Sequence, residues 1–348
     1  MVREIFVKEL VGRTGEPGCT VIDVRSPAEF AEMTIPGSIN IPLFNNEERA
    51  EVGTIYKQVS VDAAKDRGLE IVSAKLPDFI RAFQKLEGEL VVFCWRGGMR
   101  SKTTATLLDL MGIKVRRLQG GVKAYRRWVM EQLEDMDILP EGYILNGGTG
   151  TGKTAILHKL QEKGVPVLDL EGLAMHRGSV FGQIGLTSTS QKMFEANLLQ
   201  EVLKSQQAPY LVVEAESKRM GKILLPEFIT KKKQESTHIF IKMPMEVRVQ
   251  NIMNEYKPWD YHDECVLAFR RIKKYIHTPI AADIETQLEQ RQYEPAIHLL
   301  LEHYYDPRYL HSAKDCKRIV LEASNVEEAV EGVYELVCRG LTPAALKG

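Results

Sequence analysis

The stretch "GYILNGGTGTGKTAILHKL", residues 142–160, decides the fold of the second half of the chain. An apolar segment typical of a buried strand runs into a glycine-rich loop, and a helical pattern follows it. The loop matches G-x4-G-K-[ST] completely. Its glycines let backbone N–H groups approach phosphate oxygens, its lysine adds a positive charge, and its final threonine can ligate magnesium. The pattern predicts a loop for a di- or triphosphate, made of Gly147, Gly148, Thr149, Gly150, Thr151, Gly152, Lys153 and Thr154.

Acidic residues near this loop are candidates for acid, metal or substrate contacts. The strand "YLVVEAES" (210–217) carries Glu214 and Glu216 where a P-loop protein commonly has an aspartate, and "LDLEG" (168–172) carries Asp169 and Glu171. For each carboxylate, a helix cap or a solvated loop residue is an equally good explanation. No NKxD guanine signature is present, so the sequence does not identify the phosphate compound.

Short apolar segments alternate with helical ones on both sides of this loop. Strands are expected at 19–25, 89–94, 115–119, 142–147, 165–172, 210–217, 237–243 and 318–324. Such alternation predicts α/β domains with parallel sheets. We expect a first domain at 1–130, a linker at 131–141 and a P-loop domain at 142–348. Residues 246–316, dense in charge and aromatics, would be a helical insertion, and Ser324–Glu327 resembles a capping box that starts the last helix.

Composition limits the classes of function that the chain can have. The 348 residues suffice for two domains, and 46 basic against 47 acidic residues give a net charge of −1, so RNA binding would require local basic clusters. No apolar run of membrane-spanning length and no signal peptide is evident, which favours a cytoplasmic protein without membrane contact. The five cysteines are scattered and the eight histidines form no ligand pair, so no metal centre is predicted with certainty.

A second loop, "CWRGGMRS" at 94–101, surrounds one thiol with groups that stabilise an anion. Cys94 ends an expected strand, at the sheet edge where ligands bind in α/β proteins. Adjacent glycines, two arginines and a helix N-terminus all favour thiolate over thiol. We therefore expect Cys94 to be a nucleophile in a loop formed by Arg96, Gly97, Gly98, Arg100 and Ser101. A buried, inert role is expected for the other four cysteines.

The first domain resembles the rhodanese superfamily over about residues 4–130. The resemblance is carried by Asp23-Val24-Arg25, "IPGSINIP" (35–42), the cysteine loop and "LQGGVKAYRRW" (118–128), and it implies that Cys94 carries sulfur or selenium. The common sulfurtransferase loop reads C-x-x-G-x-R. Here the loop is one residue longer, the C-x5-R length of cysteine-dependent phosphatases. The longer loop would fit a phosphate-bearing donor or selenium, unless the extra residue, such as Met99, only bulges outward.

The domain order, with "DLEGLAMHRGSVFG" (169–182), "VEAESKRMG" (213–221) and "YYDPRY" (304–309), resembles the tRNA 2-selenouridine synthase family. The resemblance implies a transferase that replaces sulfur by selenium in wobble 2-thiouridine. Its co-substrates would be selenophosphate and geranyl diphosphate, with an S-geranyl intermediate. No tightly bound cofactor is implied, and a need for magnesium stays open. The implied partners are the tRNA anticodon loop and a selenophosphate-producing enzyme, and only the resemblance marks Arg177 as a phosphate contact.

Basic clusters provide candidate tRNA contacts. The first is Lys218, Arg219 and Lys222, and a second is Lys231, Lys232 and Lys233. The third, interleaved with Phe269 and Tyr275, is Arg270, Arg271, Lys273 and Lys274. A solvated helix face is the commoner use of each basic run. Aromatic rings can stack unpaired bases while cations contact phosphates. A prenyl chain would need an apolar groove, for which Met220, Met243, Met245 and Met253 are candidates, although core packing is the commoner use of each.

Two rival functions fit the same motifs. One is a cysteine phosphatase or sulfurtransferase of rhodanese fold, fused to an ATP-dependent kinase-like domain. The other is a nucleotide-gated binding module in which the rhodanese fold is only a scaffold. The cationic surroundings of Cys94 argue against the second, because a scaffold does not need an activated thiol.

Overall fold

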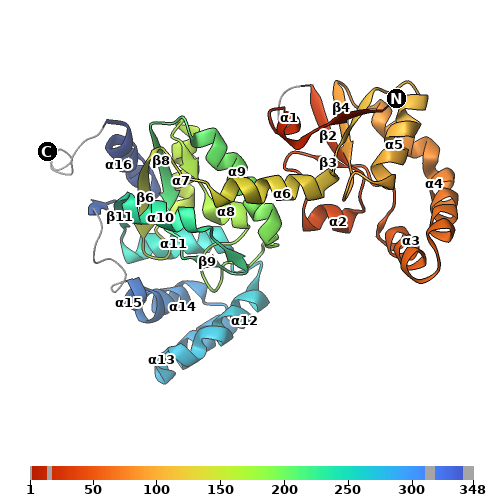
Figure 1. Ribbon diagram of the computed structural model, residues 1–348. Coiled ribbons are helices and arrows are strands. Elements are labelled where there is room, and N and C mark those ends of the chain that lie inside the picture. Colours follow the sequence, from red (N-terminus) through yellow and green to blue (C-terminus); the bar gives the residue numbers. More distant parts are fainter. Residues whose placement is uncertain (1, 14–17, 310–317, 340–348) are drawn as a thin grey trace. The chain divides into compact units, whose positions relative to one another are not determined.

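The computed structural model describes residues 2–13, 18–309 and 318–339 (Figure 1). The chain forms two compact units: Met1–Asp135 with Lys192–Leu199, and Met136–Gln191 with Gln200–Gly348. Residues 131–134 of the predicted linker are the end of helix α6 (Gly121–Glu134). The last residues of the predicted insertion, 310–316, and with them Cys316, lie outside the described residues.

The first unit is built on five parallel strands in the order β1-β5-β4-β2-β3, which confirms the predicted class. Strand β4 lies between two neighbours, and Leu90 to Phe93 are at most 2% exposed. An uninterrupted apolar run is what a strand covered on both faces requires. The strands are β1 (Arg3–Ile5), β2 (Cys19–Asp23), β3 (Ile39–Asn40), β4 (Glu89–Phe93) and β5 (Val115–Leu118).

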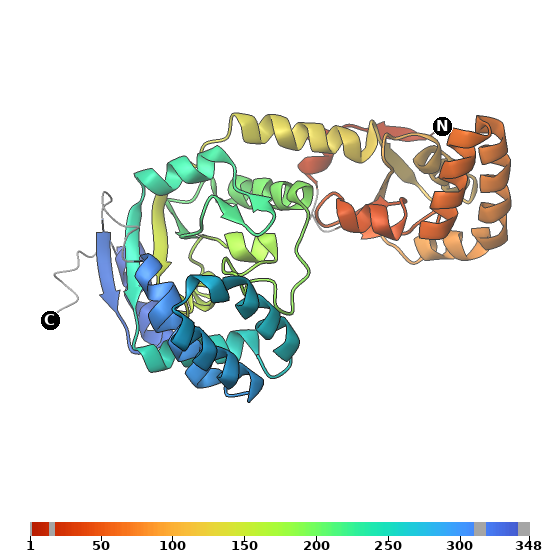
Figure 2. The same ribbon diagram turned by 90° about the horizontal axis from the view of Figure 1, so that it is seen from below.

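Six helices accompany this sheet: α1 (Val7–Val11), α2 (Pro27–Glu32), α3 (Asn46–Gln58), α4 (Val61–Gln84), α5 (Met99–Leu110) and α6. Helices α3 and α4 lie side by side as an antiparallel pair (Figures 1 and 2). The side chains of Asn45 and Ser60 cap their N-termini. Gly112, at φ +76°, ends the turn that follows α5.

The second unit also has five parallel strands, in the order β12-β11-β6-β8-β7. They are β6 (Glu141–Gly147), β7 (Val167–Leu168), β8 (Tyr210–Glu214), β11 (Thr237–Lys242) and β12 (Arg318–Glu322). Strand β6, which leads into the glycine loop, lies in the centre. The loop therefore leaves the middle of the sheet, where neighbouring strand ends can supply further groups.

Two local expectations were wrong. The strand predicted at 165–172 stops at Leu168, because the Asp169 side chain accepts a hydrogen bond from the Gly172 N–H at 2.7 Å and starts helix α8 (Leu170–Ala174). The last helix, α16 (Val326–Arg339), begins one residue later than the predicted box. Its first turn is capped by Asn325, which accepts from the Glu328 N–H at 2.8 Å.

A helical insertion separates β11 from β12, as predicted. It contains α11 (Met245–Tyr256), α12 (His262–Ile272), α13 (Thr278–Glu289), α14 (Tyr293–Leu300) and α15 (Asp306–Tyr309), with single turns at Lys273–Tyr275 and Leu301–Tyr305. Most of these helices share a core of their own and gather in one group (Figures 1 and 2). The remaining elements are α7 (Lys153–Glu162), α9 (Gln191–Ser205), α10 (Glu227–Glu235) and the hairpin β9 (Arg219–Met220) and β10 (Ile223–Leu224). Among the described helices, none has the length and apolar character that a bilayer crossing demands.

Candidate active sites

The cysteine loop connects β4 to α5 and buries its thiol. Cys94 is 3% exposed, and its Sγ lies 3.2 Å from the hydroxyl oxygen of Ser101. Gly97 turns the chain at φ +64°, and Gly98 precedes the first residue of α5. The N-terminus of this helix, with its unpaired N–H groups, thus lies beside the thiol. Backbone and hydroxyl groups together make the surroundings favourable to a bound anion.

The "LQGG" segment holds this loop in place. The Val122 N–H donates to the Cys94 carbonyl at 2.9 Å, and Arg117 donates to the Gly97 carbonyl at 2.6 Å. Gly121, at φ +59°, approaches so closely that a Cβ there would lie 2.1 Å from the Cys94 carbonyl oxygen. The glycine is therefore required by the position of the cysteine, which explains why this segment belongs to the rhodanese pattern.

The two loop arginines differ in their surroundings. Arg100 donates to both carboxylate oxygens of Glu29, at 2.5 and 3.1 Å, and is largely buried. Arg96 is exposed. The sequence did not indicate which guanidinium faces the loop. In the structure the charge of Arg100 is already paired, and Arg96 has the freedom to meet an incoming anion.

A buried ion pair supports the loop from the neighbouring strand. Arg25 and Asp23, 2% and 0% exposed, bond through several atoms, the shortest distance being 2.6 Å. The Arg25 guanidinium also lies 5.9 Å from the centre of the Trp95 ring. The acidic strand end that marked the rhodanese pattern thus helps to position the residue next to Cys94.

The P-loop has the geometry that its sequence predicts. Gly150 and Gly152 take φ values of +83° and +70°, which side-chain-bearing residues rarely adopt, and α7 begins at Lys153. The Thr151 hydroxyl closes the turn by donating to the Gly148 carbonyl at 2.9 Å. An anion at the start of α7 would meet the helix N-terminus and the charge of Lys153 together.

The insertion braces this loop through contacts that local sequence did not indicate. Arg248 on α11 donates to the Thr149 carbonyl at 2.9 Å and forms a two-pronged pair with Asp306 at 2.6 and 2.9 Å. Asn251, one turn further along, donates to the Gly150 carbonyl at 2.9 Å. These bonds fix the carbonyls of Thr149 and Gly150 and so hold the shape of the loop.

Three glutamates gather beside the last P-loop residue. The Thr154 hydroxyl donates to Glu171 at 3.0 Å, and Glu214 accepts from the Glu171 N–H at 2.5 Å. Carboxylate oxygens of Glu171, Glu214 and Glu216 all lie within 4.8 Å of one another. Glu214 is wholly buried, yet one of its oxygens has no hydrogen-bond partner among the described residues. Hard oxygen ligands around an unsatisfied buried carboxylate fit Mg²⁺.

The cluster binds protons unusually tightly. Burial, followed by the charge of Glu216, raises the pKa of Glu171 to about 8. Burial and the charge of Glu171 raise the pKa of Glu214 well above its ordinary value. Near neutral pH the group is therefore partly protonated, and a divalent cation would replace those protons.

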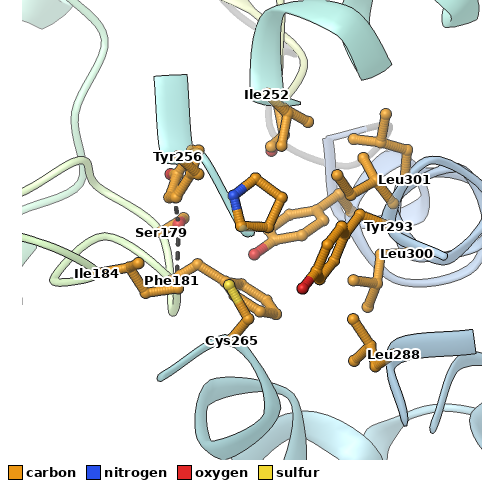
Figure 3. Close-up of a pocket in the computed structure, with 14 residues that line it drawn as sticks. Ser179, Phe181, Ile184, Ile252, Tyr256, Cys265, Leu288, Tyr293, Leu300 and Leu301 are labelled. Atoms are coloured by element: carbon orange, nitrogen blue, oxygen red, sulfur yellow. Dashed lines mark hydrogen bonds between the residues drawn. The ribbon is translucent and has the colours of Figure 1, made fainter. Parts of the chain in front are cut away.

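An apolar cavity adjoins the P-loop (Figure 3). The centre of a water molecule can move through about 60 Å³ of it. Thr149 of the P-loop and Ser179 contribute to a wall that is otherwise hydrocarbon, aromatic or sulfur. The remaining lining residues are Phe181, Ile184, Ile252, Tyr256, Pro258, Cys265, Leu288, Tyr293, Ile297, Leu300, Leu301 and Tyr305. A ligand with a phosphate end and an apolar end fits this combination.

None of the four predicted methionines lines this cavity. Met220 is 1% exposed in the β9–β10 hairpin, Met243 packs against the core of the second sheet, and Met253 packs against the core of the insertion. Core packing, the commoner use of methionine, accounts for these three. Aromatic and branched aliphatic side chains line the cavity in place of the predicted methionines.

Comparison with known proteins identifies the family. A family model described as the tRNA 2-selenouridine synthase AAA domain matches residues 140–337, more than half of the chain. The chain belongs to the tRNA 2-selenouridine synthase family. A rhodanese-like domain model matches residues 6–127.

Relatives called tRNA 2-selenouridine synthase support this membership. One from Bdellovibrio bacteriovorus is 37% identical, over 68% of this chain and 64% of the relative, so the match spans just under two thirds of that protein. One from Nitrosomonas europaea is 35% identical, over 78% of this chain and 71% of its own. One from a Sulfurovum species is 32% identical, over 88% and 92%.

The two segments 169–182 and 213–221, which carry the resemblance to the selenouridine synthase family, meet around the buried His176. A Cβ at Gly182 would lie 2.8 Å from the His176 ring, and so would one at Gly221. A Cβ at Gly178 would lie 2.4 Å from Glu171 and 2.5 Å from Glu216. The "HRGSVFG" turn and the "VEAESKRMG" strand end therefore pack directly on the acidic cluster, and their glycines are required by that packing.

Two predicted contact residues have structural partners instead. Asp169 caps α8, the role that the sequence left as an alternative. Arg177 pairs with Glu255 at 3.1 Å, and its guanidinium lies 4.8 Å from the centre of the Tyr256 ring. Both of these contacts link the "HRGS" turn to α11, so Arg177 holds two elements together beside the cavity.

The predicted tRNA clusters are mostly exposed. Lys218, Arg219 and Lys222 lie on the β9–β10 hairpin, with their side chains in solvent. Arg270, Arg271 and Lys274 are exposed at the end of α12, whereas Lys273 pairs with Glu285 at 2.5 Å.

The prediction that Phe269 stacks on a base is wrong. Phe269 is wholly buried in the core of the insertion, so its ring is unavailable to a base. Tyr275, 59% exposed, keeps its ring in solvent.

Proposed function

We propose that this chain replaces sulfur by selenium in the wobble 2-thiouridine of tRNA, in two steps. In the first, the base sulfur attacks geranyl diphosphate: a C–S bond forms, the C–O bond to the diphosphate breaks, and the base loses a proton. In the second, selenium from selenophosphate displaces the alkylated sulfur. Family membership supports the selenouridine product, and the architecture of the two loops supports the division of labour.

The observation that carries the first step is the apolar cavity bordered by Thr149 of the P-loop. A nucleoside triphosphate has no hydrocarbon to place there, whereas a prenyl diphosphate has both parts. The N–H groups of the loop and the charge of Lys153 would stabilise the diphosphate as it leaves. Glu171, Glu214, Glu216 and the Thr154 hydroxyl would hold a Mg²⁺ ion, which supplies positive charge to the departing phosphates.

The second step makes use of the cysteine loop. Alkylation lets the sulfur depart as a neutral thiol, which is a better leaving group than the sulfur of the free thiocarbonyl. The net reaction consumes selenophosphate and water and releases geranylthiol and inorganic phosphate: a C–Se bond forms, and the C–S and P–Se bonds break. Cys94, among the N–H groups of its loop, would position selenophosphate or attack its phosphorus. In that attack an S–P bond forms and the P–Se bond breaks, hydroselenide leaves to attack the C2 atom of the base, and water then breaks the S–P bond and releases phosphate. A separate enzyme would produce the selenophosphate, and the reaction would take place in the cytoplasm, where tRNA is found.

The rival phosphatase gains no support from the loop. A C-x5-R phosphatase needs its arginine to bind the phosphate, but Arg100 is engaged by Glu29. Turnover of an aryl phosphate or of ATP by the purified chain would revive this rival and its kinase-like partner domain.

The deciding experiment uses purified chain and an anticodon stem-loop RNA that carries 2-thiouridine. With geranyl diphosphate and Mg²⁺, we expect the nucleoside mass to increase by one geranyl group, and a subsequent addition of selenophosphate should convert the product to 2-selenouridine. Mass spectrometry of the digested nucleosides measures both steps. An unchanged nucleoside under both conditions would overturn the proposal.

A further inference from the structure

A wide groove lies beside Cys94 in the first unit. The α3–α4 pair forms one part of its lining, and the cysteine loop with the start of α5 forms another. The centre of a water molecule can move through about 1160 Å³ of it, against about 60 Å³ for the cavity beside the P-loop. Cys94 itself is among the residues that line it. No single stretch of sequence indicates this groove, because the residues that line it come from several segments between 43 and 107.

The size and the character of the groove exceed what a selenium donor needs. Selenophosphate has five heavy atoms and is wholly polar, so the N–H groups of the loop suffice for it. The groove instead exposes apolar side chains: Tyr56 is 57% exposed, Leu69 69%, Met99 58% and Val61 43%. Exposed apolar side chains gathered around one reactive group indicate a site for an apolar ligand.

The rest of the lining suits a nucleic acid. It carries the ring of Trp95, 39% exposed and adjacent to Cys94, which offers a face on which a base can stack. Among the lining residues, five cations accompany a single carboxylate, Asp66. The cations are Arg49, Lys57, Lys65, Arg96 and Arg100. Arg49, Arg100 and Lys65 already have carboxylate partners, so the exposed Lys57 and Arg96 are the cations of the groove that can meet the phosphates of a polyanion.

We propose that this groove holds the hydrocarbon chain of an S-alkylated thiouridine in RNA, with the base on Trp95 and its C2 atom at Cys94. The inference rests on the function proposed above and deepens it. The alkyl group then improves the leaving sulfur and also identifies the base that is ready for selenium. Burial of the chain contributes affinity that an unalkylated thiouridine lacks, so the order of the two steps follows from binding.

Binding without turnover tests this inference. The full chain carrying Cys94→Ser is titrated against two labelled anticodon stem-loops that differ only in the base, S-geranyl-2-thiouridine or S-methyl-2-thiouridine. We expect the geranyl RNA to bind about tenfold more tightly. Adding Leu69→Asp should abolish most of this preference, because it places a charge on the apolar wall, and Leu69→Met should retain it.

Leu110→Asp is the matched control. Leu110 is a 79% exposed leucine of the same unit that does not line the groove, so its replacement should leave the preference intact. The cavity beside the P-loop is identical in both aspartate variants, so any difference between them reports the groove alone.

Two results would overturn the inference: equal affinities for the geranyl and methyl RNAs, or the same preference in the Leu69→Asp and Leu110→Asp chains. Either would leave the groove to another occupant, such as an apolar segment of a protein. A failure of the proposed function is distinguishable, because it would abolish selenium incorporation while leaving this binding preference in place.

Discussion

The loop after β4 and the loop after β6 have the same backbone construction. Each leaves the interior of a parallel sheet, turns at glycine of positive φ (Gly97 in the first loop, Gly150 and Gly152 in the second) and leads into a helix. Their surroundings differ. The first buries a thiol at the side of a wide groove, and the second presents Lys153 and Thr154 between an acidic cluster and a narrow apolar cavity.

The difference teaches where the chemistry of an anion loop comes from. Glycine turns and helix N-termini bind negative charge in both loops. The loops differ in the side chain that they add. Cys94, before the first turn, can form a bond as a nucleophile, whereas Lys153, after the second turn, supplies fixed positive charge that stabilises a leaving group. The predictions below separate these two roles.

The largest effect is expected from Cys94→Ser. The hydroxyl is a far weaker nucleophile than the thiolate, so selenium incorporation should fall about a thousandfold or more. Geranylation, which we propose for the other loop, should continue at its normal rate. Both are measured as nucleoside masses in single-turnover reactions. Normal selenium incorporation by the variant would remove Cys94 from the mechanism.

Lys153→Ala should produce the complementary loss. Without its point charge, the P-loop stabilises the departing diphosphate less well, and geranylation should slow about a hundredfold. Selenation of RNA that already carries the geranyl group should be unaffected. Lys159→Ala, a surface lysine on the same helix, is the control. Equal losses in both half-reactions would contradict the separation of the loops.

Arg248→Ala should weaken the P-loop without removing any phosphate ligand. It takes away the brace on the Thr149 carbonyl and leaves Asp306 unpaired, so the second unit should lose about 2 kcal/mol of unfolding free energy. The KM for geranyl diphosphate should rise as the loop loosens. Denaturant titration and initial rates measure the two effects, with the exposed Arg270→Ala as control. An unchanged KM would show that the loop holds its shape alone.

The smallest effect concerns pH and magnesium. Because the pKa values of Glu171 and Glu214 are raised on folding, the folded chain binds more protons than the unfolded chain from about pH 4 to about pH 8. The cluster's contribution to stability is therefore lost as the pH rises through this window. Mg²⁺ should raise the melting temperature by about 2–4 °C at pH 8.5 and by less at pH 6.

Glu214→Gln should remove this magnesium response, whereas the exposed Glu162→Gln should keep it. A magnesium-induced shift in melting temperature of equal size at both pH values would indicate that the ion binds elsewhere. The acidic cluster would then have no role as a magnesium site.

Local sequence predicted both loops because each loop is one continuous segment. The spacing of its glycines and of its cysteine or lysine determines how the chain turns. The brace on the P-loop joins residues 99 and 58 positions apart, Thr149 to Arg248 and Arg248 to Asp306, so no window of sequence contains it. The sequence indicated part of the acidic cluster, as carboxylates at strand ends. Only the pairing of β8 with β6 and β7 brings Glu214 to Glu171, which accepts from the Thr154 hydroxyl.

The sequence contained a signal that Phe269 is buried, and the prediction of a base contact did not use it. Cys265, Ala268, Phe269 and Ile272 are spaced at i, i+3, i+4 and i+7 and form one apolar face of α12, and all four are buried. The neighbouring cations drew Phe269 into a predicted RNA contact, although helical periodicity places it inside. Periodicity should outweigh charge when a ring lies on the apolar face of a helix.

The bond from α11 to the P-loop has a practical consequence for anyone who would shorten this protein. A chain trimmed between β11 and β12 would keep every strand of the second sheet and every letter of the glycine motif. It would lose the guanidinium and the amide that hold the carbonyls of Thr149 and Gly150, together with most of the cavity wall. The minimal catalytic fragment of the second unit must therefore include the helices of the insertion, which contribute no residue to the glycine motif.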